Sequence, residues 1–93
     1  MSQPNRSEVL QEIVSTIAKL AGVPAESIDE GHRLMKDVRL DSLAIYELVV
    51  DLEERYGMQI SNEDAERLET VGDAADYILR RLAEGGTPPD GSR

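Results

Sequence analysis

The residues best placed to do chemistry are Asp41-Ser42-Leu43, which lie where a polar stretch gives way to a helical pattern. Asp41 is a good N-cap, because its side chain can accept a backbone N–H left open at a helix start. Ser42 would then present its hydroxyl in the first turn, where N–H groups and the helix dipole stabilise an anion such as a phosphodiester. The same pair is also an ordinary cap, so the triplet alone leaves both interpretations open.

Other catalytic and metal-binding chemistry has little support in the sequence. The chain has one histidine, His32, and no cysteine. A serine nucleophile needs a general base within hydrogen-bond reach and a group that orients this base, whereas a lone loop histidine is usually a surface residue. Asp29, Glu30 and Asp37 do not have the ligand spacing of a calcium loop. We therefore expect no catalytic residue and no metal site, and any activation of Ser42 would come from another protein.

Composition and charge restrict the class of protein. The 93 residues include 10 basic and 19 acidic side chains, a net charge of −9 with histidine neutral. Nucleic-acid binding needs a basic face, so we expect none, whereas an acidic surface suits basic protein partners. No apolar run approaches the roughly 20 residues of a membrane span, and the polar N-terminus is unlike a signal peptide. We expect a cytoplasmic monomer without stable membrane insertion.

Apolar residues at three- and four-residue spacing predict an all-α fold. Ser7 is the expected cap of a first helix that ends at Gly22. The stretch from there to Leu40 is expected to be a long loop, and loops of this length are often functional. Asp41 then caps a second helix that ends at Gly57.

Two further helices are expected in the second half of the chain. Ser61 and Asn62 can cap a short one, and Thr70 with Asp73 forms a variant of the capping box at the start of the last helix. The predicted architecture is a small bundle of three main helices plus one short helix, with a long loop between the first two.

The domain organisation is simple. We expect a flexible N-terminus over residues 1–6, one folded domain over residues 7–84 and a disordered tail over residues 85–93, which is rich in Gly and Pro. A chain of this length buries about 60–65% of its unfolded surface. A binding or carrier module is therefore easier to build from it than a deep catalytic cleft.

Several segments extend the pattern around Ser42 in a fixed order. They are Leu40-Asp41-Ser42-Leu43, Glu47-Leu48-Val49, Leu52-Glu53-Glu54-Arg55-Tyr56-Gly57, Ile60, Ala65, Leu68, Thr70-Val71-Gly72-Asp73 and Tyr77-Ile78. In this order and spacing, the series resembles the acyl carrier proteins over residues 9–82, about the whole predicted domain. The Asp-Ser-Leu triplet alone is a weak signal, whereas the whole series is specific.

The resemblance implies a covalent cofactor on Ser42. This would be 4′-phosphopantetheine, moved from coenzyme A by a separate magnesium-dependent phosphopantetheinyl transferase. Its terminal thiol would let a chain without cysteine carry acyl groups as thioesters. The protein itself would be a non-catalytic carrier that delivers them to the synthases, reductases and transferases of fatty-acid or related acyl-chain synthesis.

The resemblance also implies two sets of contact residues. Residues around the second helix would dock on basic patches of partner enzymes through weak, salt-sensitive contacts; they are Asp41, Leu43, Glu47, Asp51, Glu53 and Glu54. An acyl chain would fold back between the helices into a pocket lined by Leu48, Leu52, Ile60, Ala65, Leu68, Ala74 and Tyr77. A solvated helix face would give the same acidic pattern, and a plain hydrophobic core would give the same apolar one.

Three positions depart from the commonest fatty-acid carriers. Arg39 stands where these usually have Gly, Ala44 where they often have an acidic or small polar residue, and Tyr46 where they have a smaller aliphatic one. A dedicated polyketide, specialised-lipid or aminoacyl/peptidyl carrier in a free-standing, dissociated system is thus an alternative. A second alternative is an unmodified helical adaptor, in which Ser42 would be only a cap.

Overall fold

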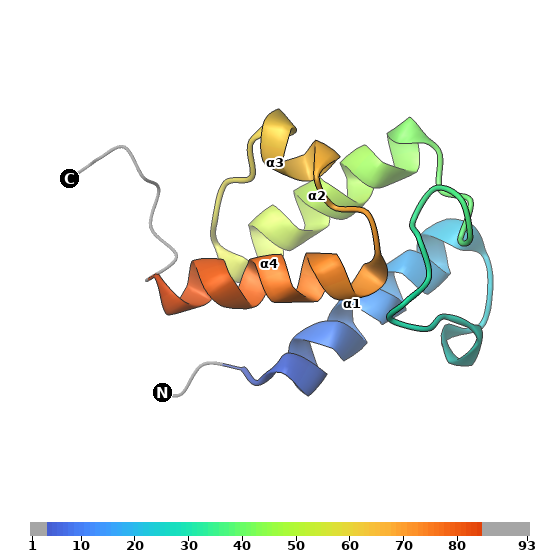
Figure 1. Ribbon diagram of the computed structural model, residues 1–93, viewed down its shortest axis with the longest axis horizontal. Helices are drawn as coiled ribbons and strands as arrows, with labels where there is room; N and C mark the ends of the chain where they lie inside the picture. Colours follow the sequence, from blue (N-terminus) through green and yellow to red (C-terminus); the bar gives the residue numbers. More distant parts are fainter. Residues whose placement is uncertain (1–3, 85–93) are drawn as a thin grey trace.

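The structure is a computed structural model that describes residues 4–84 of the chain. These residues form α1 (Arg6–Ala21), a single 3-10 turn η1 (Ala25–Ser27), α2 (Ser42–Tyr56), α3 (Asn62–Glu66) and α4 (Val71–Ala83) (Figure 1). The predicted all-α fold is confirmed, with three main helices, one short helix and a long connection between α1 and α2. The predicted tail, 85–93, lies outside the described residues, as do residues 1–3 of the predicted flexible N-terminus.

The start of α1 differs from the prediction. Asn5, and not Ser7, is the N-cap: its side chain accepts the N–H of Glu8 at 2.8 Å, and the Glu8 carboxylate accepts the N–H of Asn5 at 3.0 Å. Asn5 prevails because Glu8 stands three residues after it and completes a capping box. Arg6 lies in the first turn and forms ion pairs with α4 and with the long loop. Asn5 and Arg6 therefore belong to the cap and first turn of α1.

The predicted starts of the other three α-helices, at Asp41, Ser61 and Thr70, and the predicted ends of the first two, at Gly22 and Gly57, are confirmed. Asp41, Ser61 and Thr70 each accept a backbone N–H from the first turn of α2, α3 and α4. Helices α1 and α2 end at Gly22 and Gly57, whose φ angles are 72° and 64°. Glycine reaches this left-handed region without steric cost, so both helices stop where the sequence indicates.

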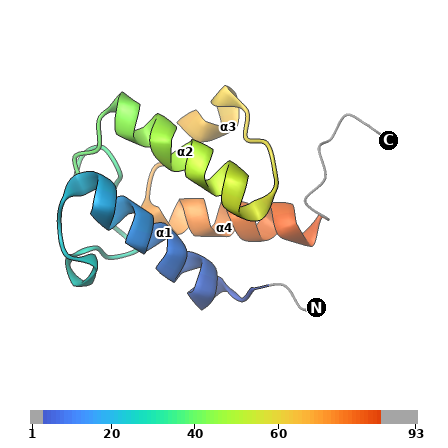
Figure 2. The same ribbon diagram turned by 180° about the vertical axis from the view of Figure 1, so that it is seen from behind.

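Helix α1 packs against both α2 and α4, and these contacts enclose most of the core. The buried side chains are mainly aliphatic: Val9, Ile13, Ile17, Leu34, Leu40, Leu48, Val49, Leu52, Met58, Ile60, Val71, Ala74, Ala75, Tyr77 and Ile78. Helix α3 contributes no buried residue. Both views place it at the edge of the bundle, on the opposite side from α1 (Figures 1 and 2).

The long loop between α1 and α2 is fastened to the start of α4. The N–H of Leu34 donates to the carbonyl of Glu69 at 2.9 Å, and the N–H of Val71 donates to the carbonyl of His32 at 3.0 Å. The side chains of Leu34 and Leu40 are buried in the core. This loop therefore has a fixed path, and it delivers the chain to the first residue of α2 in a defined position.

Candidate functional site

Ser42 is the first residue of α2, and it is exposed. Immediately before it, Leu40 is buried, and its N–H donates to the carbonyl of Leu34 at 2.9 Å. The Asp41 carboxylate accepts the N–H of Ala44 at 2.8 Å and caps the helix. These contacts hold the Ser42 hydroxyl at a solvent-facing helix N-terminus, where open N–H groups and the helix dipole stabilise a negative charge.

The imidazole of His32 is engaged within its own loop. Its Nδ1 accepts the N–H of Asp29 at 2.9 Å, and the residue is half-buried. Over residues 4–84, no group of three His, Cys, Asp or Glu side chains is arranged to hold a metal ion. No helix in that range is both long and apolar enough for a membrane span.

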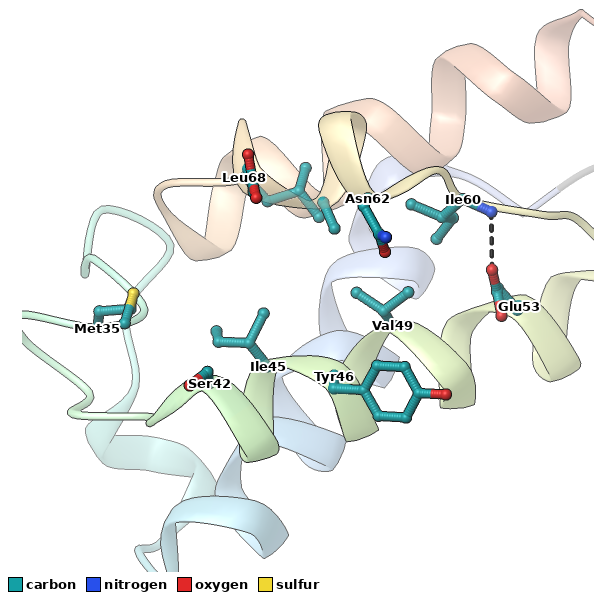
Figure 3. Close-up of a pocket in the computed structure, with 11 residues that line it drawn as sticks. Met35, Ser42, Ile45, Tyr46, Val49, Glu53, Ile60, Asn62 and Leu68 are labelled. Carbon is teal, nitrogen blue, oxygen red and sulfur yellow. Dashed lines mark hydrogen bonds between the residues drawn. The ribbon is translucent and has the colours of Figure 1, made fainter.

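A groove of about 580 Å³ opens beside Ser42 (Figure 3). One wall is a face of α2, along which Ser42, Ile45, Tyr46, Val49 and Glu53 follow one another at helical spacing. The facing wall is formed by residues of the 60–68 segment, and Met35 from the long loop lies at the Ser42 end. The complete lining is Met35, Ser42, Ile45, Tyr46, Val49, Glu53, Ile60, Asn62, Ala65, Glu66 and Leu68.

The groove contains part of the residue set predicted for an acyl pocket. Ile60, Ala65 and Leu68 line it. The sequence reasoning missed the α2 wall, although helical spacing from Ser42 could have identified Ile45, Tyr46, Val49 and Glu53. No local signal marks Met35, because its place depends on the path of the long loop.

The other four residues of that set lie elsewhere. Leu48, Leu52 and Ala74 have no exposed surface and are part of the core behind the groove. Tyr77 is 6% exposed and lines a second, smaller pocket of about 250 Å³ between α3 and α4. The structure therefore separates the predicted set into groove, core and second pocket.

The Tyr77 hydroxyl connects α4 to the segment that carries α3. It donates to the Asp64 carboxylate at 2.8 Å and accepts a hydrogen bond from Nη1 of Arg81 at 2.6 Å. The same Nη1 donates to the carbonyl of Gln59 at 2.9 Å. Burial, and then the hydrogen bond to Asp64, raise the pKa of Tyr77 above its usual range. The 59–64 segment is thus held to α4 by polar contacts.

Three of the predicted docking residues face solvent on α2. Leu43 is 66% exposed, and Glu47 and Glu54 are also exposed. Tyr46, which is 63% exposed, adds an aromatic ring to this surface. The exposed surface of α2 therefore carries both apolar and anionic side chains.

The remaining docking candidates are already engaged within the fold. Asp41 caps α2. The Asp51 carboxylate accepts a hydrogen bond from the hydroxyl of Thr16 on α1 at 3.2 Å. The Glu53 carboxylate accepts a hydrogen bond from the N–H of Ile60 at 2.8 Å (Figure 3). Asp51 therefore joins α1 to α2, and Glu53 closes the groove at the end away from Ser42.

Comparison with known proteins agrees with the all-helical fold. The family model described as a phosphopantetheine attachment site matches residues 11–78. The acyl carrier protein of Rubrobacter xylanophilus is 37% identical over 81% of this chain and 93% of its own length. That of Chlamydia caviae is 40% identical over 75% of this chain and 91% of its own length. A solved structure of the thermally stable acyl carrier protein from Enterococcus faecalis, 38% identical, superposes with a TM-score of 0.71 over 83% of this chain and 98% of its own.

The chain belongs to the acyl carrier protein family, the non-catalytic carriers that bear covalent 4′-phosphopantetheine. That group supplies a terminal thiol to which acyl groups are linked as thioesters. The residues present fit it, because an exposed serine hydroxyl at a helix N-terminus opens directly onto a groove. The chain has no cysteine, so a cofactor thiol would have no competitor within the protein.

Proposed function

We propose that Ser42 is the attachment point of 4′-phosphopantetheine. The observation that carries this proposal is the exposed hydroxyl in the first turn of α2, between the buried anchor Leu40 and the exposed Leu43. Because the loop fixes this position, the hydroxyl is available to an enzyme without local unfolding. The helix N-terminus would stabilise the phosphodiester after transfer.

The partner that modifies Ser42 is a phosphopantetheinyl transferase, and later partners are acyl-chain synthases, reductases and transferases with basic docking patches. The exposed carboxylates Glu47 and Glu54 and the apolar Leu43 support this assignment. Contacts between exposed charges are weak and salt-sensitive, which suits a carrier that must leave each enzyme quickly.

The cargo belongs to fatty-acid or related acyl-chain synthesis, the usual role of the family. A dedicated carrier for one pathway is the second candidate. It is favoured by Tyr46 and Arg39, two exposed residues that flank Ser42 in the sequence and depart from the commonest fatty-acid carriers. These side chains alter the surface that a partner enzyme meets, while leaving the attachment site itself intact.

The test is an intact mass measured before and after incubation with a broad-specificity phosphopantetheinyl transferase, coenzyme A and magnesium. We expect the native protein to gain one phosphopantetheine and Ser42→Ala to gain none. Ser61→Ala is the matched control, since Ser61 is an exposed serine that caps α3, and it should be modified as the native protein is. A folded, unmodified native sample that gains no mass would contradict the proposal and favour the unmodified adaptor.

A further inference from the structure

The loop that leads to Ser42 carries two exposed cations in a strongly acidic chain. They are Lys36 and Arg39, and the chain as a whole has a net charge of −9. Within residues 4–84, neither side chain takes part in an ion pair or a side-chain hydrogen bond, whereas Arg33 and Arg55 each pair with carboxylates. The two cations are therefore available to a group outside this part of the chain.

The one carboxylate within the same segment is already paired. Asp37 accepts the backbone N–H of Arg33 at 2.8 Å, and the same carboxylate oxygen lies 3.3 Å from Nε of Arg33. Backbone and side-chain hydrogen bonds from Arg33 lower the pKa of Asp37, so this side chain remains an anion that pairs with its own neighbour. The charges of Lys36 and Arg39 are thus left unbalanced.

The loop holds both cations at a fixed place. They lie between Leu34 and Leu40, whose side chains are buried in the core and anchor the segment at both ends. Met35, from the same segment, reaches the Ser42 end of the groove (Figure 3). The cations therefore belong to a fixed segment at the N-terminal end of α2.

The exposed face of α2 beyond Ser42 has the opposite charge. Glu47 and Glu54 are exposed on this helix. At physiological ionic strength the Debye length is about 8 Å, so an approaching group responds to nearby charges more than to the net charge of the chain. An anionic membrane or a nucleic acid would meet the carboxylates of α2 as well as the loop. The mixed charge therefore fits the face of a protein that has patches of both signs.

We propose that Lys36 and Arg39 form a second docking element, which contacts an acidic patch on the enzyme that loads the carrier while α2 contacts a basic patch on the same enzyme. This inference rests on the proposed attachment at Ser42 and adds the chemistry of the partner. Two patches of opposite sign match in one orientation only, whereas a uniformly basic partner repels the loop. The two cations thus take part in partner selection.

The first test measures the local charge by amide NMR of the apo-protein at about 0.15 M ionic strength. The anionic nitroxide carboxy-PROXYL should broaden the signals of residues 35–39 more than the cationic aminomethyl-PROXYL does, and the order should reverse for residues 46–54. In the double variant Lys36→Gln with Arg39→Gln, the excess effect of the anionic nitroxide on the loop should disappear. Stronger broadening of the native loop by the cationic nitroxide would overturn the inference.

The second test compares two enzymes that acylate holo-protein of verified mass. One is the loading enzyme of the source organism, isolated by its activity on this holo-protein, and the other is a malonyltransferase from an unrelated organism, chosen for a basic face around its active site. With the loading enzyme, Lys36→Glu with Arg39→Glu should lower kcat/KM about tenfold, since two exposed charge contacts are reversed. With the malonyltransferase, the same variant should react at least as fast as the native protein, because repulsion is removed.

Arg80→Glu is the matched control, since Arg80 is an exposed cation on α4. It lies nine residues beyond Val71, where the loop is fastened, or about 14 Å along the helix. It should leave both rates nearly unchanged. Exchange of a carboxylate near the active-site entrance of the loading enzyme for lysine should restore the rate of the charge-reversed variant. Equal losses with both enzymes, or no restoration by any such exchange, would overturn the inference.

Two further results separate this inference from its neighbours. If the cations pair with the phosphodiester of the cofactor instead, the phosphorus NMR signal of free holo-protein will shift in the charge-reversed variant while both acylation rates stay unchanged, and the inference is overturned. A native sample that gains no phosphopantetheine contradicts the attachment at Ser42. The nitroxide measurement needs no cofactor, so the two failures are distinguishable.

Discussion

The α1–α4 side and the α3 side of this small bundle are held together by different forces. Helices α1 and α4 meet through side chains with no exposed surface, among them Val9, Ile13 and Ile78. Helix α3 has no fully buried residue: Ala65 packs partly buried against the core, and one hydrogen bond from Tyr77 and the Ser61 cap also hold the helix. Apolar burial is the dominant favourable term in folding, whereas each hydrogen bond adds a small net amount. One side thus supplies stability, and the other supplies the wall of the groove.

The largest expected effect comes from a cavity on the α1 side. Ile13→Ala removes a fully buried side chain, so we expect the free energy of unfolding to fall by about 3 kcal/mol, measured by urea denaturation. The matched change is Leu43→Ala on α2. It truncates a side chain that is 66% exposed, and it should lower the free energy of unfolding by less than about 0.5 kcal/mol. Equal losses for the two variants would show that the core is not concentrated where the structure places it.

The next variant tests whether polar contacts hold α3 against α4. Tyr77→Phe removes the hydroxyl that donates to Asp64 and accepts from Arg81, so we expect a loss of about 1–2 kcal/mol. Hydrogen exchange should show the faster opening in α3, at the amide of Asp64 in particular, with α1 less affected. Tyr46→Phe serves as the control, because Tyr46 is 63% exposed and its change should leave both measurements unaltered. Uniform acceleration across all helices would contradict a local role for Tyr77.

The same hydroxyl predicts a dependence of stability on alkaline pH. The folded pKa of Tyr77 is raised above the ordinary value of 10.0, first by burial and then by the Asp64 carboxylate. At pH values above 10.0, the unfolded chain loses this proton before the folded chain does, so stability should fall as pH rises towards the folded pKa. In urea titrations across this range, the native protein should lose stability more steeply than Tyr77→Phe. Parallel curves for the two proteins would contradict the assignment.

Sequence patterns predicted the helix ends better than the groove, because caps are local and grooves are not. Asp41, Ser61 and Thr70 need only their own first turn to act as caps. One predicted cap was wrong: Asn5 caps α1 and Ser7 does not. Both residue types are good caps, but only Asn5 has Glu8 three residues after it to complete a capping box.

The groove depends on how distant segments meet. Along α2, Leu48 and Leu52 have the same apolar character and helical spacing as Ile45 and Val49. The sequence shows one broad apolar stripe, and the pattern cannot tell which edge faces the core and which faces the 60–68 segment. Tertiary packing sends Leu48 and Leu52 inwards and leaves Ile45 and Val49 on the groove wall. Met35 arrives from a loop whose path is fixed by hydrogen bonds to residues far along the chain.

A smaller effect concerns the side of α2 that is proposed to dock on partner enzymes. Glu47→Lys reverses an exposed charge, and we expect kcat/KM for phosphopantetheinyl transfer to fall about fivefold at low salt, since one surface charge contact contributes on the order of 1 kcal/mol. The difference should shrink as salt rises, because exposed charges are screened. Glu26→Lys makes the same charge change on the exposed η1 turn and should have little effect. Equal losses for both variants would indicate a response to net charge rather than to a docking site on α2.

The smallest effect concerns the backbone that delivers Ser42. Arg39 has a φ angle of 70°, in the left-handed region, at the position where the commonest fatty-acid carriers usually have glycine. A left-handed conformation costs a residue with a Cβ roughly 1–2 kcal/mol, whereas glycine has greater conformational freedom in the unfolded chain, worth about 0.4–1 kcal/mol. We therefore expect Arg39→Gly to raise the free energy of unfolding by about 0.5 kcal/mol in urea denaturation.

Two further variants separate the backbone from the charge. Arg39→Ala removes the guanidinium but keeps the Cβ, so it should not reproduce the gain. Gly57→Ala adds a Cβ at φ 64°, where no atom beyond its two chain neighbours lies within 4 Å, and it should lose about 1 kcal/mol through backbone strain alone. If Arg39→Ala stabilises as much as Arg39→Gly does, the gain comes from removing the charge. If only glycine stabilises, the left-handed backbone at Arg39 costs the protein stability. The arginine would then be kept for a reason other than folding, such as contact of its guanidinium with a partner enzyme.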